Sequence, residues 1–235
     1  MVKAVIFDLD GTLYDSAGLA WRLALKEASR GRLGMLAAER KARKELAGRH
    51  FGDSGILYEE FFERIGKHCG CADAKARQWY FNVYLKDMVK ILDRHFTARP
   101  GIDSLLEKFR TQGIKAAVFS DYSCVERKMT ALGIDYGRFD VITDSPTLGG
   151  FKPCRESFEG IAAKLEVAPA ECLMIGDRLD TDGEGAAAAG MQFIHLLKNE
   201  SAAGKFRKHP LDDGFRHLEW NDLLPLLQDY VCDSI

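Results

Sequence analysis

The chain has 235 residues, of which 46% are hydrophobic and 29% are charged. This composition is that of an ordinary globular protein, and it excludes collagen-like, fibrous and disordered chains. The length fits one large domain or a core with a smaller insert, since a domain usually holds roughly 100–200 residues. The net charge of -2 argues against a general nucleic-acid binder, which would carry a basic balance.

The sequence also lacks the signs of a membrane or secreted protein. No apolar run approaches the roughly 18 residues that a membrane-spanning helix needs, and the opening segment has the pattern of a strand, with no sign of a signal peptide. Because the six cysteines are scattered and no secretory leader precedes them, we expect reduced thiols in the cytoplasm. The pair Cys69-Gly70-Cys71 has no second cysteine or histidine pair at zinc spacing, so we interpret it as a turn between helices.

The first 96 residues combine one predicted strand with a helical insert. Residues 3–9 form a short β-branched and aromatic run, typical of a buried parallel strand, and Gly11 breaks it. Residues 16–96 show a helical pattern that predicts a small bundle of four helices, in the stretches 19–23, 35–46, 56–65 and 79–92. The insert is basic: residues 15–96 hold 16 Lys/Arg against 11 Asp/Glu, and the remainder holds 17 against 24.

After Pro100-Gly101, helical segments and short apolar runs alternate. The predicted helices are 102–109, 125–132, 157–165 and 183–190, and the predicted strands are 114–120, 139–143, 172–176 and 192–197. This alternation predicts an α/β fold, with a Rossmann-like parallel sheet covered by helices on both faces. We interpret 199–210 as a flexible loop and 211–227 as a closing strand and helix. The predicted organisation is therefore a core of residues 1–15 and 97–235 with a helical cap of residues 16–96.

Polar side chains follow several predicted strands, at the edge where parallel strands place their ligands. They are Asp8 and Asp10, Ser120, Lys152, and Asp177 and Asp182. Phosphoryl transfer needs a nucleophile, a proton donor, hydrogen bonds to the phosphoryl oxygens and a cation, and each role has a candidate here. Alone, Asp8-Leu9-Asp10-Gly11-Thr12 would equally suit a turn with solvated acids that ends a strand.

Together these residues resemble the phosphatases of the haloacid dehalogenase superfamily. The four motifs of that superfamily stand here, in the same order and at the same spacing, as Asp8-x-Asp10-Gly11-Thr12, Ser120, Lys152-Pro153 and Gly176-Asp177-x-x-x-x-Asp182. The resemblance covers the whole chain, including the helical insert between the first and second motifs. It implies a Rossmann-like core with a helical cap.

The resemblance also implies a role for each motif residue. Asp8 would attack phosphorus and form an aspartyl-phosphate, and Asp10 would protonate the leaving group and then activate water. Thr12 would support the loop and Ser120 would donate a hydrogen bond to a phosphoryl oxygen. Lys152 would bridge the nucleophile and the phosphate, a role that suits a compact ammonium.

The implied cofactor is Mg²⁺, a hard ion that prefers oxygen ligands. By the resemblance, Asp8, Asp177 and the backbone carbonyl of Asp10 hold the ion, and Asp182 acts close by, through water. Glu184 stands near Asp182 where relatives usually carry an apolar residue, and this departure could loosen the last carboxylate.

Residues that would contact substrate are harder to predict. Ser120 and Lys152 are candidates, and so is Asp121, although relatives often carry an amide at that position and its role is open. In the insert, the basic and aromatic loop Gly48-Arg49-His50-Phe51-Gly52 lies where capped relatives read the substrate, so Arg49 and His50 are further candidates. We interpret Arg40, Lys41, Arg43 and Lys44 as a solvated helix face, and Trp79, Tyr80, Phe81 and Tyr84 as packing within the cap.

We therefore predict a Mg²⁺-dependent phosphatase whose partner is a small phosphorylated metabolite, with neither nucleic acid nor membrane involved. A phosphomutase related to beta-phosphoglucomutase stays open, because it uses the same motifs. A nucleotide-binding module without catalysis is less favoured, since no Gly-x-Gly-x-x-Gly follows the first strand and no phosphate-binding Gly-x-x-x-x-Gly-Lys-Ser/Thr occurs. The sequence indicates neither the particular substrate nor the oligomeric state.

Overall fold

The computed structural model describes residues 1–197 and 215–230, and it contains a six-stranded parallel sheet. The strands lie in the order β3-β2-β1-β4-β5-β6, and every neighbouring pair is parallel. Their bounds are β1 Ala4–Phe7, β2 Lys115–Ser120, β3 Val141–Asp144, β4 Cys172–Gly176, β5 Gln192–Leu196 and β6 Arg216–Leu218. The predicted fold class is confirmed.

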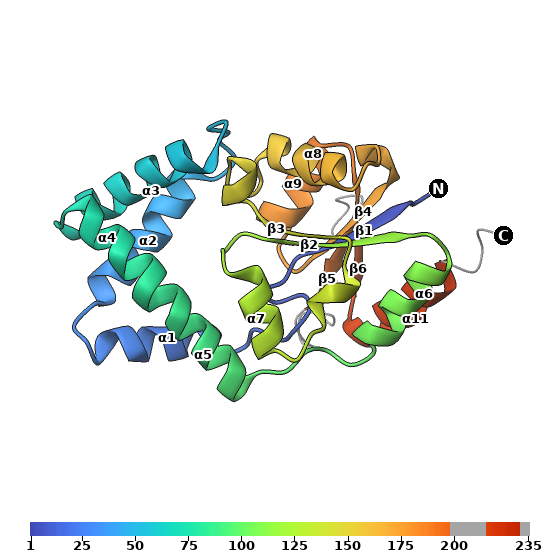
Figure 1. The fold of residues 1–235 in the computed structure, drawn as a ribbon, viewed down its shortest axis with the longest axis horizontal. Coiled ribbons are helices and arrows are strands. Elements are labelled where there is room, and N and C mark those ends of the chain that lie inside the picture. Colours follow the sequence, from blue (N-terminus) through green and yellow to red (C-terminus); the bar gives the residue numbers. More distant parts are fainter. Residues whose placement is uncertain (198–214, 231–235) are drawn as a thin grey trace.

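Helices cover both faces of this sheet (Figure 1). Successive residues of β1 point to opposite faces: Val5 and Phe7 join one buried hydrophobic cluster, and Ala4 and Ile6 join the other. Helices α8 (Arg155–Lys164) and α9 (Glu184–Ala188) pack on the second cluster, and the first is covered by α6 (Ile102–Thr111), α7 (Val125–Ala131) and α11 (Trp220–Tyr230). The central strands β1, β2 and β4 are buried on both sides, which explains why they are largely apolar runs.

The predicted closing elements are confirmed as β6 and α11, while the predicted loop 199–210 lies outside the described residues. Short 3-10 turns complete the described core at Tyr136–Arg138, Pro146–Leu148 and Pro169–Glu171, and a π-helical turn at Leu179–Gly183 precedes α9. Within the described part of the chain, no helix is both long and apolar enough to cross a membrane.

The insert forms the predicted helical bundle. Its elements are α1 Leu19–Ala28, α2 Leu33–Leu46, α3 Ser54–Cys69, α4 Asp73–Trp79, the π-helical turn Tyr80–Tyr84 and α5 Leu85–His95. The last three run on as one helix, because the residues on either side of each junction keep helical backbone angles. This fourth helix begins at Asp73, earlier than predicted. The prediction missed its start because the first residues are mostly polar and show little apolar periodicity. Gly70, in the left-handed region, ends α3 and makes Cys69-Gly70-Cys71 the predicted turn.

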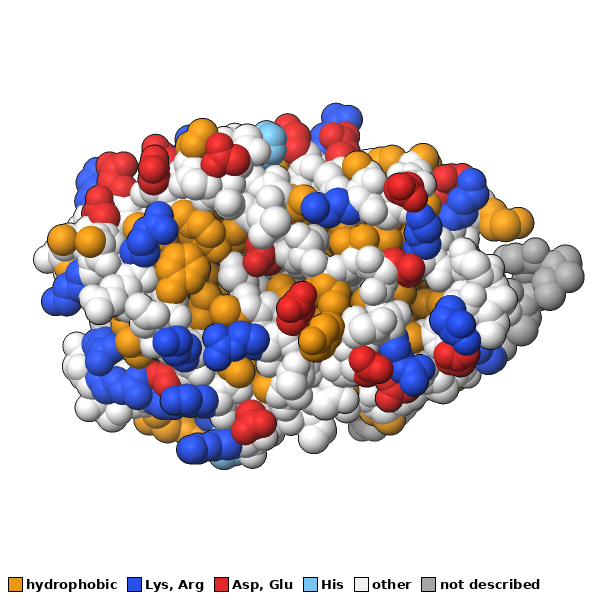
Figure 2. All heavy atoms as spheres, in the orientation of Figure 1, with side chains coloured by type: hydrophobic (Ala, Val, Ile, Leu, Met, Phe, Trp, Pro, Cys, Tyr) orange, Lys and Arg blue, Asp and Glu red, His pale blue; other side chains and the backbone are white. Residues whose placement is uncertain are grey.

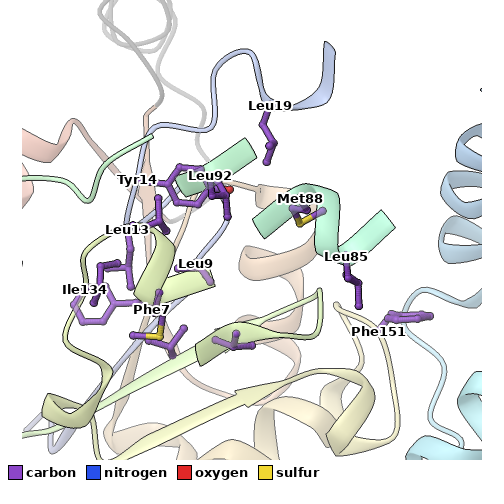
Figure 3. Packing of buried hydrophobic residues seen from close by; sticks show 14 of the residues in the cluster. Phe7, Leu9, Leu13, Tyr14, Leu19, Leu85, Met88, Leu92, Ile134 and Phe151 are labelled. Atoms are coloured by element: carbon purple, nitrogen blue, oxygen red, sulfur yellow. The ribbon is translucent and has the colours of Figure 1, made fainter. Parts of the chain in front are cut away.

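The cap is seated on the core through shared hydrophobic packing. In Figure 3, Leu92 of α5 lies beside Tyr14, which follows β1, and Leu85 lies toward Phe151 of the core, with Met88 between them on the helix. All five side chains are buried and belong to one cluster that runs without a break from cap to sheet. The packing therefore holds the cap over the carboxyl ends of the strands. The domain boundaries near residues 16 and 96 stay a prediction.

Candidate active site

The carboxyl ends of the central strands bring the predicted motif residues together. Asp8 directly follows β1, and its backbone N–H donates to the carbonyl of Ile175 on the neighbouring β4 at 2.9 Å. Ser120 is the last residue of β2, and Asp177 follows β4. These three side chains are buried although all are polar. Buried polar groups require partners: Lys152 and Thr12 donate to Asp8, and the Ser120 hydroxyl lies beside Asp10.

Lys152 is the cation at the centre of the site. Its ammonium donates to Asp8 Oδ1 at 2.9 Å and to Asp182 Oδ1 at 2.7 Å, and the side chain is only 1% exposed. Burial opposes the charge of Lys152, but the two carboxylates outweigh it and raise the pKa of the lysine. The ammonium therefore stays charged at neutral pH. Thr12 donates to the other oxygen of Asp8, at 3.3 Å.

Three buried carboxylates form a cluster that fits a divalent metal ion. One oxygen from each of Asp8, Asp177 and Asp182 lies within 4.8 Å of the others. The glycines of the motifs permit this approach: a Cβ at Gly11 would lie 2.3 Å from Asp177 Oδ2, and one at Gly176 would lie 2.4 Å from the Asp182 carboxyl. Oxygen ligands of this kind suit hard cations such as Mg²⁺.

Electrostatics in the cluster also favour a cation. Burial raises the pKa of Asp8, and Asp177 and Asp10 add to that effect against the attraction of Lys152. Burial likewise raises the pKa of Asp182 to about 8, with Lys152 opposing and Asp8 and Asp177 contributing. One lysine does not neutralise three carboxylates, so a divalent ion would complete the balance. That the carbonyl of Asp10 joins the ligands stays a prediction.

The raised pKa of Asp182 predicts how stability depends on pH when a chelator removes divalent ions. Between the ordinary value of 3.8 and the folded value of about 8, the folded state binds more protons than the unfolded state. Stability therefore falls as the pH rises through this window. We expect the melting temperature in chelator to fall from about pH 5.5 to 8, and to fall less in Asp182→Asn. Excess Mg²⁺ should remove most of the decline, with about 2.7 kcal/mol of stabilisation at 100 times its Kd.

Differential scanning fluorimetry of the two proteins, with and without Mg²⁺, measures this directly. Identical pH profiles for the wild type and Asp182→Asn in chelator would show that Asp182 carries no raised pKa, and would weaken the metal assignment.

Asp10 lies beside the cluster and is held by three donors. Tyr14 Oη donates to Asp10 Oδ1 at 2.8 Å, Ser120 Oγ lies 3.0 Å from Oδ2, and the Lys128 ammonium pairs with Oδ2. Burial alone would raise the pKa of Asp10, but Lys128 outweighs it, with the help of the two hydroxyls, and the pKa is lowered. The carboxylate is therefore ionised in this arrangement.

Lys128 was not among the candidates from sequence. It belongs to none of the four motifs, and it lies on the short helix α7. A signal was nevertheless present: Val125, Lys128 and Met129 follow the spacing of a buried helix face, and all three are buried. A lysine at such a position requires a buried partner, and Asp10 is that partner.

Asp121 ties together the loop after β2, the loop before Lys152 and the cap. Its Oδ1 accepts hydrogen bonds from the Lys152 backbone N–H at 3.0 Å and from Ser145 Oγ. Arg43 of α2 donates to its carbonyl at 2.9 Å and to Oδ2 at 3.3 Å. A carboxylate suits this position because it meets a guanidinium. Contact between Asp121 and substrate stays a prediction.

The interpretation of Arg43 as part of a solvated helix face is wrong. Its side chain is 11% exposed, pairs with the buried Glu39 at 2.9 Å, and lies 4.2 Å from the ring centres of both Tyr122 and Phe151. Glu39 lies on the same helix, but the core supplies the two aromatic rings, and the helix pattern alone could not reveal them. The expected packing role of Trp79, Tyr80 and Tyr84 is confirmed, since all three are buried.

The loop 48–52 lies against the segment that precedes Lys152. The Gly48 N–H donates to the Phe151 carbonyl at 3.1 Å, and the Phe51 N–H donates to the Gly149 carbonyl at 2.8 Å. The Arg49 and His50 side chains are exposed, and the Arg49 guanidinium lies over the Phe51 ring. Contact between either side chain and substrate stays a prediction. Glu184 is also exposed, and Asp182 keeps its bond to Lys152 beside it.

A helical cap over the strand ends of a parallel sheet, with a carboxylate cluster beneath it, defines a capped α/β enzyme with an acidic, metal-binding centre. The model of the family described as haloacid dehalogenase-like hydrolase matches residues 2–190, and the chain belongs to this family. Together with its relatives, the site identifies the chain as a phosphoric monoester hydrolase of the phosphatase type.

Similar proteins include phosphatases and a mutase. The chain is 28% identical to a glyceraldehyde 3-phosphate phosphatase of Methanopyrus kandleri, over 85% of this chain and 86% of that protein. It is 29% identical to the beta-phosphoglucomutase of Bacillus subtilis, over 75% of each. The solved structure of CbbY from Rhodobacter sphaeroides in complex with phosphate has the same fold, with a TM-score of 0.64 and 23% identity, covering 93% of this chain and 94% of that one.

Proposed function

We propose that this protein is a Mg²⁺-dependent phosphatase that hydrolyses a small phosphorylated sugar or related metabolite through an aspartyl-phosphate on Asp8. The observation that carries the proposal is the environment of Asp8. Lys152 and Thr12 hold its two oxygens, and carboxylates of Asp177 and Asp182 lie within 4.8 Å. A structural carboxylate would not need such a costly arrangement of buried charges.

Each residue of the site has a task in this reaction. Asp8 attacks phosphorus, and Lys152 draws the phosphoryl oxygens toward the nucleophile. When substrate binds, the Ser120 hydroxyl would turn its one hydrogen from Asp10 to a phosphoryl oxygen. The negative charge of a bound phosphate would raise the pKa of Asp10 from its lowered value, so that Asp10 binds a proton before the reaction. Asp10 then gives this proton to the leaving oxygen and takes one from the water that hydrolyses the aspartyl-phosphate. Asp8, Asp177 and the Asp10 carbonyl would hold Mg²⁺, with Asp182 nearby, and the bound ion would supply positive charge that offsets the phosphate.

The substrate class follows from the cap and from the relatives. Lys and Arg side chains gather over the cap on the face shown in Figure 2, as the basic composition of the insert predicts, and they would attract an anion. Relatives include phosphatases named for glyceraldehyde 3-phosphate and for phosphoglycolate. Both names denote small phosphate esters.

The test is release of inorganic phosphate from a panel of sugar phosphates and short-chain acid phosphates, with Mg²⁺ or with chelator. We expect turnover that needs Mg²⁺ and depends on Asp8. Transfer of phosphate between two positions of one sugar, with little free phosphate, would instead favour the phosphomutase, which the relative in Bacillus subtilis makes the second candidate. Equal turnover in excess chelator would remove the metal from the mechanism.

Replacing Arg49 and His50 tests whether the loop 48–52 selects the substrate. Because Arg49 and His50 are exposed and alanine keeps the backbone hydrogen bonds of their loop, the Arg49→Ala/His50→Ala protein should fold normally. We expect it to change the ranking of sugar phosphates while turnover of a small nitrophenyl ester changes less. Steady-state kcat/KM values across the panel measure the effect. An unchanged ranking would show that the loop has only a structural role.

A further inference from the structure

A fully buried lysine touches two residues of the proposed site without belonging to any of its motifs. The Lys128 side chain is 0% exposed, and its ammonium pairs with Asp10 Oδ2 and donates to Ser120 Oγ at 3.1 Å. It also lies 5.6 Å from the centre of the Tyr122 ring. Burying a lysine is costly unless its charge is paired, so the contacts with Asp10 and Ser120 account for a lysine at this buried position of α7.

The contacts of Lys128 differ from those of Lys152. Lys152 pairs with Asp8 and Asp182, on the metal side of the nucleophile. Lys128 pairs with Asp10, which is proposed to handle the protons. The two buried lysines therefore divide the carboxylates of the site between them, one for the nucleophile and one for the acid and base.

The geometry limits what Asp10 can do. A carboxylate offers about four acceptor sites. Among the described residues, Tyr14 uses one on Oδ1, and Ser120 and Lys128 lie against Oδ2. The remaining site on Oδ1 is the one left for the leaving group or for water. The Lys128 ion pair is the strongest of the three contacts, because both partners are charged.

Ser120 has supports that do not depend on Lys128. Its oxygen accepts from the Tyr122 N–H at 3.1 Å and lies 2.9 Å from the Tyr122 carbonyl. Removing Lys128 therefore leaves Ser120 anchored to the backbone, while Asp10 loses its only charged donor among the described contacts.

We propose that Lys128 is a positioning residue that acts through Asp10: the ion pair holds Oδ2 and presents Oδ1 to the leaving oxygen and to the attacking water. This inference rests on the proposed phosphatase function, and it extends the set of functional residues beyond the four motifs. Lys128 itself does not contact the substrate.

The test is a double-mutant cycle with Lys128→Met, which keeps the length of the side chain and removes the charge. Against an alkyl phosphate, Lys128→Met should lose about 10²-fold in kcat, within the range of a misplaced general acid and base. With nitrophenyl phosphate it should accumulate labelled aspartyl-phosphate, as expected for a slow second step. In an Asp10→Asn background the same change should cost less than about threefold, because there is no carboxylate left to position.

Arg127→Met is the matched control, since Arg127 is the exposed neighbour on the same helix and loses the same charge. It should keep the wild-type rates. If Lys128→Met alone does not fold, Asp10→Asn is compared with the double variant, which buries no unpaired charge. A further large loss there would show that Lys128 acts independently of Asp10 and would overturn the proposal.

The two proposals fail in different ways. An active wild type with additive losses in the cycle would overturn the role of Lys128 and leave the phosphatase intact. A wild type that neither releases phosphate nor forms an aspartyl-phosphate would overturn the proposed function, and the role of Lys128 with it.

Discussion

Asp8→Asn is expected to abolish phosphate release while the protein stays folded. An amide is a far weaker nucleophile than a carboxylate, so the attack on phosphorus should stop. The loss should be roughly 10⁴-fold or more, as for removal of a nucleophile in other covalent enzymes. No labelled protein should form with any phosphate ester, including the activated nitrophenyl ester.

The stability of Asp8→Asn separates lost chemistry from lost structure. Because burial raises the pKa of Asp8, its ionised form at pH 7 costs folding free energy when no metal is present. The neutral amide removes that cost, so the melting temperature in chelator should equal or exceed that of the wild type. Mg²⁺ should stabilise the variant less than the wild type, since one ligand is gone. Residual turnover near the wild-type rate would exclude Asp8 as the nucleophile.

Asp10→Asn is expected to separate the two halves of the reaction. An alkoxide leaves poorly without a proton, so attack on an alkyl phosphate should slow by roughly 10²–10⁴-fold, as is typical of general acid catalysis. A nitrophenolate leaves readily without one. With nitrophenyl phosphate the variant should still form the aspartyl-phosphate on Asp8, whereas the second step, which needs a base to activate water, should remain slow.

Rapid-mixing experiments should record this as a burst of nitrophenol, about one per active site, followed by a slow steady rate. Phosphate should remain bound to the Asp10→Asn protein. The Asp8→Asn/Asp10→Asn double variant should carry no phosphate. Steady turnover of the activated ester at near wild-type speed, without a burst or labelled protein, would show that Asp10 is not the base.

Much of the architecture could be predicted because it depends on local patterns. Segments such as 172–176 are continuous apolar runs, since parallel strands are buried on both faces, and β4 occupies that range. The alternation with helices indicated the parallel sheet, and the strand ends indicated where Asp8, Ser120 and Asp177 would meet. The start of the fourth cap helix was less visible, because polar residues of its first turns carry little periodicity.

The ion pairs that hold the site residues in place could not be predicted from local patterns. Arg43 lies 78 positions from Asp121, and Lys128 lies 118 positions from Asp10. Both lysine and arginine are usually exposed on helices, so a local pattern favours a solvated position for each. Only the packing of α2 and α7 against the strand ends gives these charges their partners.

The sequence by itself determined the fold class, the family resemblance and the positions of the motif residues, because strand periodicity and the turn glycines act over a few residues. The tertiary structure decided which charges are paired: Lys152 with Asp8 and Asp182, Lys128 with Asp10, and Arg43 with Asp121. The physical reason is that a buried charge is tolerated only beside a specific partner. That partner comes from another element, and folding alone brings the two together.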